Sequence, residues 1–178
     1  MSLRKWAENG WLRQQETNSN EIKMLLGVVD RDLADTAVDK ISPDLRFIAA
    51  LGAGMLAATI ALRACGYRAT VGRGQHEKTI ESLELTIGAS SKTVQMLKTF
   101  SRKRNTANYD MSGAVSEQEL QQMQKLAAEL RGQVESLAGK EPSQSIEMMP
   151  PLTPVSPQVV SFTKPCAERW VSGPSSFL

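Results

Sequence analysis

Residues 42–66, SPDLRFIAALGAGMLAATIALRACG, decide the fold of this chain. Ser42 followed by Pro43 is typical of a helix start, because Ser caps free backbone N–H groups and Pro needs no hydrogen bond at the first helical position. Gly66 is typical of a helix end. Apolar residues occupy every face between these signals, so the helix is expected at the centre of the fold or in an interface between two subunits. Its many Ala and Gly residues allow another backbone to approach closely.

Amphipathic helices are predicted on both sides of this stretch, from apolar residues at steps of three and four. They cover about residues 20–38, 75–87, 91–108 and 116–139, and a short opening helix covers Leu3–Glu8. The last helix has the clearest start, because Ser116 and Glu119 have capping-box spacing. Val115 and Leu120 form a hydrophobic staple around this start. Residues 66–74 are predicted to be a loop.

The chain of 178 residues is long enough for one domain with its own core. Aromatic residues make up only 5%, and Ala, Leu and Met are common, which favours packed helices. We therefore predict an all-α fold, a four- to five-helix up-and-down bundle with short connections between antiparallel neighbours. The bundle covers 19–140 and follows a short helix and polar connector over 1–18. A disordered tail is predicted over 141–178, which holds seven of the eight prolines.

Charge and cysteine content limit the classes of function. The net charge is only +2, so any attraction to nucleic acid must come from a local patch. Cys65 and Cys166 lie in unlike contexts and form neither a disulfide framework nor a metal-binding spacing. We expect a reducing, cytoplasmic location, with no metal and no cofactor. The N-terminus lacks the apolar region of a secretory signal, and the uncharged run over 47–62 is short for a membrane span.

Polar chemistry is concentrated in FSRKRNTANYD, residues 100–110, where the helix over 91–108 is predicted to end. Arg104 lies one heptad beyond Leu97, so its side chain is expected on the inward face of the helix. An Arg there either bonds to the last carbonyl groups of the helix or binds a phosphate through its planar fork of donors. Tyr109 follows at a step of five, about 140° around a continuous helix. The two side chains would converge only if the helix ended between them.

Neighbouring polar residues extend this candidate site. The candidate RNA-binding residues are Lys98, Arg102, Lys103 and Asn108. His76 is the only histidine and begins the helix predicted over 75–87. It is either an ordinary surface residue or, if the fold brings it to Arg104, an acid–base group.

The bundle over 19–140, with Arg104–Asn105 near a late helix end and Tyr109 five positions after the Arg, resembles the HEPN superfamily. Members of that family are helical, usually dimeric domains, and many are metal-independent ribonucleases of toxin–antitoxin or other defence systems. The family pattern is an Arg, often followed by Asn, and then a His after four to six intervening residues. Arg104 and Asn105 match this pattern, and Tyr109 takes the position of the His.

The resemblance implies a homodimer that binds RNA or a nucleotide through Arg104, Asn105 and Tyr109. Because an ordinary tyrosine is not a general base at neutral pH, ribonuclease activity would be weak or absent. The resemblance also implies an antitoxin or nucleotidyltransferase partner, since a nearby Tyr is modified by such a partner in some HEPN pairs. The alternative is a helical protein–protein interaction module without a nucleic-acid role. The low net charge and the apolar stretch over 42–66 favour that alternative.

Overall fold

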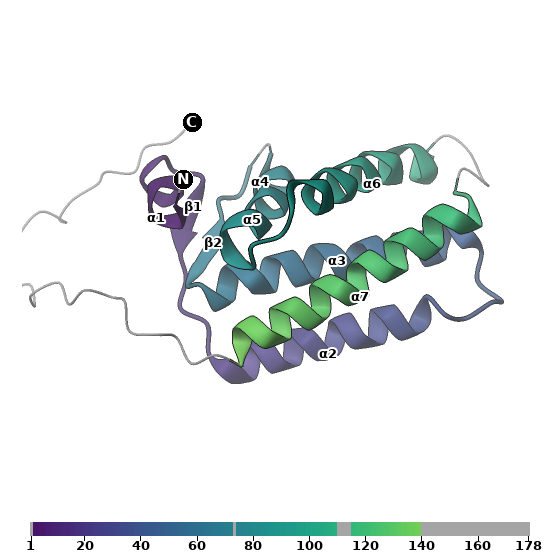
Figure 1. Ribbon diagram of the computed structural model, residues 1–178, viewed down its shortest axis with the longest axis horizontal. Coiled ribbons are helices and arrows are strands. Elements are labelled where there is room, and N and C mark those ends of the chain that lie inside the picture. Colours follow the sequence, from purple (N-terminus) through teal and green to yellow (C-terminus); the bar gives the residue numbers. More distant parts are fainter. Residues whose placement is uncertain (1, 73, 110–114, 140–178) are drawn as a thin grey trace, which may run out of the picture. The chain divides into compact units, whose positions relative to one another are not determined.

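The computed structural model describes residues 2–72, 74–109 and 115–139, with the backbone alone for 105–109. The tail predicted over 141–178 lies outside the described residues. The elements in Figure 1 are α1 (Leu3–Glu8), β1 (Leu12–Gln14), α2 (Ser19–Asp35), α3 (Pro43–Ala64), β2 (Tyr67–Ala69), α4 (Gln75–Glu81), α5 (Leu83–Thr86), α6 (Ser91–Tyr109) and α7 (Glu117–Ala138). This part of the chain is mainly helical, which confirms the all-α prediction.

Helix α3 is the central element of the fold and packs against α2, α6 and α7 (Figure 1). Its side chains Phe47, Leu51 and Ile60 are fully buried. Gly54 allows α7 to approach closely, because a Cβ atom at this position would stand 3.1 Å from the terminal methyl group of Met123. The central position predicted for this helix is confirmed.

The apolar composition of α3 also meets the length and hydropathy of a membrane-crossing helix, and among the described residues it is the one helix that does so. More than half of its most apolar window is buried inside the fold. A core helix enclosed by other helices has the same composition, so the length and hydropathy of α3 are only weak evidence for a membrane span.

Capping residues set the helix boundaries. At the start of α3, the Ser42 Oγ accepts a hydrogen bond of 3.4 Å from the N–H of Leu45. Gly66, with a φ of 80°, follows the end of this helix. At the start of α7, Ser116 and Glu119 form the predicted capping box in both directions. The signals in these stretches are local, which is why the sequence alone locates them.

An antiparallel pair of strands, β1 and β2, corrects the prediction of a polar connector before α2 and of a loop over 66–74. Leu12 pairs with Ala69, and Arg13 pairs with Arg68. Strands of three residues are too short for a pattern of alternation, so no sequence period indicates them. A small apolar cluster consists of Trp6, Leu12, Leu62 and Ala69. The N-terminal segment is therefore tied to the end of α3.

The helix predicted over 75–87 is in fact two helices, α4 and α5, which meet at Ser82. The Ser82 hydroxyl is buried and donates a hydrogen bond of 2.7 Å to the carbonyl oxygen of Thr79. Such a bond to the preceding turn competes with the regular ladder of a helix and bends it. The bend fixes the orientation of α4, which carries His76.

Candidate functional site

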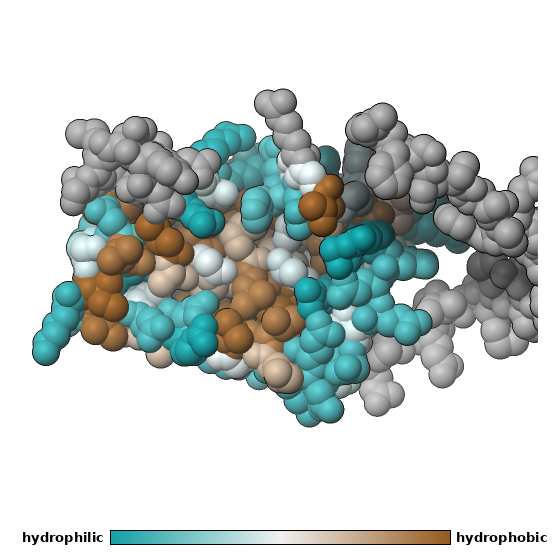
Figure 2. Space-filling view, turned by 180° about the vertical axis from the view of Figure 1, so that it is seen from behind, coloured by the Kyte–Doolittle hydropathy of each residue, from teal (hydrophilic) through white to brown (hydrophobic). Residues whose placement is uncertain are grey.

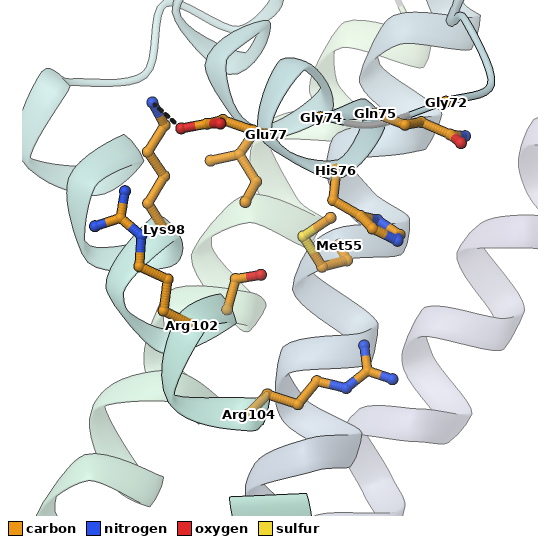
Figure 3. A pocket seen from close by; sticks show the side chains of 11 residues that line it. Met55, Gly72, Gly74, Gln75, His76, Glu77, Lys98, Arg102 and Arg104 are labelled. Atoms are coloured by element: carbon orange, nitrogen blue, oxygen red, sulfur yellow. Dashed lines mark ion pairs between the residues drawn. The ribbon is translucent and has the colours of Figure 1, made fainter. Parts of the chain in front are cut away.

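A polar cavity of about 540 Å³ lies between α4 and α6. The charged and titratable side chains that line it are His76 and Glu77 of α4 and Lys98, Arg102 and Arg104 of α6, and Met55 of α3 lies beside them. Figure 3 shows the side chains of His76 and Arg104 on the same side of the cavity, over α3, whereas Arg102 lies beside Lys98. The fold thus brings to one cavity two predicted site residues that are far apart in the sequence.

Arg104 is exposed, which corrects the prediction that it lies on the inward face of α6. Val94, Leu97 and Phe100 bury α6 against the core, but no residue from Ser101 to Arg104 is buried. A straight α-helix drifts by about 20° per heptad, and the contact with the core ends one turn before Arg104. The guanidinium of this residue is therefore accessible to a ligand.

The backbone of α6 continues as a helix through Tyr109. The helix end that would let the side chains of Arg104 and Tyr109 converge does not lie between them. The side chains of Asn105, Asn108 and Tyr109 themselves lie outside the described residues. Among the described side chains lining the cavity, His76 is the acid–base candidate, because an imidazole has one nitrogen that can accept a proton and one that can donate it.

Lys98 is held by two carboxylates. Its Nζ lies 2.6 Å from Glu81 and 3.6 Å from Glu77, and its side chain is only 12% exposed. The hydrogen bond to Glu81 raises the pKa of Lys98. Burial acts to raise the pKa of Glu81, but hydrogen bonds from Lys98 and Lys78 outweigh it and lower that pKa. Lys98 therefore braces α6 against α4, and its charge is largely neutralised within the fold.

Lys103 forms an ion pair with Glu119 and does not line the cavity. Hydrogen bonds from Lys103 and from Ser116 lower the pKa of Glu119 to about 2. Lys103, which was predicted to bind RNA, instead holds α6 to the start of α7 through this ion pair.

Lys78 of α4 is held by the N-terminal segment. Its Nζ lies 4.1 Å from the ring centre of Trp11 and 5.2 Å from that of Trp6. The two rings form an edge-to-face pair with centroids 5.5 Å apart. Lys78 also forms an ion pair of 2.9 Å with Glu81. The N-terminal segment therefore positions the helix that carries His76.

Arg102 and Arg104 are the cations of the cavity that have no carboxylate partner among the described residues. A guanidinium offers planar, paired donors that match the oxygens of a phosphate. Gln75 and Ser101 also line the cavity, and no sequence pattern marks them, because tertiary packing brings them there. The guanidinium of Arg104, on the same side of the cavity as the imidazole of His76, is suited to bind a phosphate near a group that can move a proton.

No cluster of three or more His, Cys, Asp or Glu side chains that could hold a metal ion occurs among the described residues. Comparison with known proteins finds no matching family model, no matching curated protein and no matching solved structure.

Proposed function

We propose that this chain is a HEPN-like, up-and-down helical bundle that binds a phosphate of RNA or of a nucleotide in the cavity between α4 and α6. Arg104 and Arg102 would hold the phosphate oxygens. The proposal is carried by one observation: His76 and Arg104 line a single polar cavity, and its two arginines have no carboxylate partner in the part of the chain that the structure describes. The setting would be a cytoplasmic toxin–antitoxin or stress system, with an antitoxin or a nucleotidyltransferase as partner.

His76 is the residue proposed to replace the histidine that the sequence pattern lacks. In a metal-independent cleavage, its imidazole would accept the proton of a ribose 2′-hydroxyl while that oxygen attacks the phosphorus. The bond between phosphorus and the 5′-oxygen would break, leaving a 2′,3′-cyclic phosphate, and the departing 5′-oxygen would take a proton from water. Arg104 would bind the non-bridging oxygens, on which negative charge accumulates. Ser101, which lines the same cavity, offers a hydroxyl that can donate to a phosphate oxygen.

The apolar face of α3 supports a homodimer. Exposed or half-exposed apolar residues follow one stripe of this helix at helical spacing: Leu45, Ile48, Ala49, Gly52, Met55 and Leu56. Figure 2, which views the fold from the side opposite to that of Figure 1, shows apolar residues gathered on this face. In a two-fold dimer, the stripe of one copy would pack against the same stripe of the other copy, so that both apolar faces would be buried.

Met55 belongs both to the apolar stripe and to the lining of the cavity. A partner subunit on α3 would therefore border the cavity. A two-fold axis through the stripe would place two cavities next to one seam.

Binding and cleavage of a fluorescently labelled single-stranded RNA test this proposal. We expect Arg104→Ala and Arg102→Ala each to weaken binding and each to reduce the dependence of affinity on salt, by about 0.7 in the slope of log K against log [salt]. Arg31→Ala is the matched control, because it removes an exposed arginine from α2, which does not line the cavity.

The role of His76 is tested separately. If the chain cleaves RNA, we expect His76→Ala to abolish cleavage and to leave RNA affinity nearly unchanged. Loss of affinity in the Arg31→Ala control equal to that in Arg104→Ala would show that binding is non-specific and would refute the cavity as the site.

A second candidate function, a protein–protein interaction module, is favoured by the same exposed stripe of α3. It predicts that RNA affinity is absent and that the stripe recruits a partner of a different sequence. Sedimentation of the purified chain alone separates the two, because only the first proposal requires a dimer of identical chains.

A further inference from the structure

A second polar cavity, of about 140 Å³, lies next to the first. It is lined by Arg63 and Thr59 of α3, Arg68 of β2, and Gln75 and Thr79 of α4. Gln75 lines both cavities.

Helix α4 separates the two cavities. Gln75 and Thr79 are four residues apart and share one face, whereas His76 and Ile80 share the next face and line the larger cavity. Along α3, Met55 lines the larger cavity and Thr59 the smaller one. These two residues are one turn apart, about 6 Å along the helix axis.

The donors of the smaller cavity are cationic or neutral, and no carboxylate is found among the described residues that line it. The Nη1 of Arg63 donates a hydrogen bond to Glu21. The Nε of Arg63 is buried and has no hydrogen-bond partner among the described residues. A buried donor without an acceptor is uncommon in a folded protein, where a water molecule or an ion often satisfies such a group. The hydroxyl groups of Thr59 and Thr79 donate to their own helices, so they do not supply that acceptor.

A second observation also points to an anion here. Arg13 and Arg68 are direct partners across the antiparallel strand pair. Like charges at directly opposed positions repel one another and destabilise a sheet. Arg68 donates to the side-chain oxygen of Gln15 at 3.2 Å, and no carboxylate among the described residues forms an ion pair with it. An oxyanion bound beside Arg68 would relieve this repulsion.

We infer that the smaller cavity is a second phosphate subsite, formed by Arg63, Arg68 and the amide of Gln75. A cavity of this volume has room for a tetrahedral oxyanion. The ligand of this protein then carries two phosphate groups, one at Arg104 and one at Arg63–Arg68, on either side of Gln75. Successive phosphates of one RNA strand, or the two groups of a bisphosphorylated nucleotide, would meet this requirement.

The subsite itself stands on the second cavity alone, and its use together with Arg104 rests on the proposed function. The direct test is NMR of the arginine Nε–H groups in the wild-type chain, titrated with inorganic phosphate against sodium chloride of equal ionic strength. We expect the Arg63 Nε–H resonance to shift with phosphate, in the wild type and in Arg104→Gln, and the shift to be lost in Arg68→Gln. An Arg63 resonance that does not move, or that moves equally with chloride, would overturn the inference.

The size of the ligand is tested with short single-stranded RNA that does or does not carry a 5′-phosphate, and with pyrophosphate. A charge-assisted hydrogen bond corresponds to about a tenfold change in affinity. We expect the 5′-phosphate to tighten RNA binding about tenfold in the wild type and to make no difference in Arg68→Gln. Arg31→Gln, in which the lost charge lies on α2, should keep the tenfold preference.

The outcomes separate the two proposals. Pyrophosphate binding that depends on both Arg68 and Arg104, without RNA binding, would identify a nucleotide ligand and keep the second subsite. RNA binding that depends on Arg104 but shows no preference for the 5′-phosphate, with an unshifted Arg63, would keep the proposed function and remove the subsite.

Discussion

Gly52→Arg is the substitution that most directly tests the homodimer. Gly52 is exposed in the middle of the apolar stripe of α3, and a Cβ atom added there would meet nothing within 4 Å. A single subunit therefore has room for the arginine side chain. In a dimer formed by this stripe, the same side chain would lie at the centre of the seam.

Gly52→Arg is expected to stabilise the folded subunit and to destabilise the dimer. Replacing a glycine inside a helix by a good helix former stabilises the subunit by about 0.8–1 kcal/mol. At the seam, an unpaired guanidinium that loses water costs several kcal/mol. Even 3 kcal/mol of this cost would weaken dimerisation by more than about 100-fold.

The assay is sedimentation velocity over a range of concentrations, together with thermal unfolding at the same concentrations. We expect the wild type to be dimeric with a Tm that rises with concentration. Gly52→Arg should be monomeric, with a Tm independent of concentration and circular dichroism that remains helical. A Gly52→Arg chain that dimerises with wild-type affinity would refute the proposed seam, and so would a wild type that is monomeric at every concentration.

Gly54→Leu is the matched contrast, because Gly54 lies two residues away on the face of α3 that packs against α7. Overpacking there costs typically about 1–3 kcal/mol, so we expect a lower Tm in thermal unfolding and a lower midpoint concentration in urea unfolding. Lys78→Met should weaken the attachment of α1 and β1 by about 0.5–2 kcal/mol, seen as faster amide exchange over 3–14 with α7 unaffected. The lowered pKa of Glu119 contributes stability above about pH 4.5 that is lost as the pH falls toward 2, because the carboxylate is then protonated. Glu119→Gln should therefore lose less stability than the wild type over that acid range in a pH series of urea unfolding curves, and equal losses would contradict this assignment.

Helix boundaries could be predicted from the sequence wherever a capping signal is local. Ser42 before Pro43, and Ser116 with Glu119, each act within one helical turn, so a few residues contain the whole interaction. The strand pair could not be predicted, since its partners Leu12 and Ala69 are distant in sequence and each strand is short. The bend at Ser82 depends on burial, which local pattern does not reveal.

The candidate site was predicted in part. The sequence singled out Arg104 and His76, and the fold brings both to one cavity. The prediction that Arg104 faces inward, made from its position seven residues after Leu97, was wrong. Such a repeat identifies the inward face only while the helix stays in contact with the core. Lys98 and Lys103 were predicted as RNA-binding residues, but each pairs with an acid from another helix, Glu81 and Glu119. Pairing of this kind is a property of the tertiary structure.

The aromatic pair that holds Lys78 gives the protein an optical reporter of its own. Trp6 and Trp11 are two of the three tryptophans, and the third is Trp170. In a Trp170→Phe chain, tryptophan emission would come from the Trp6–Trp11 pair alone. Its rings lie against the cation of the helix that carries His76. Ligand-induced movement of α4 would thus change the colour and intensity of this emission, without any attached dye.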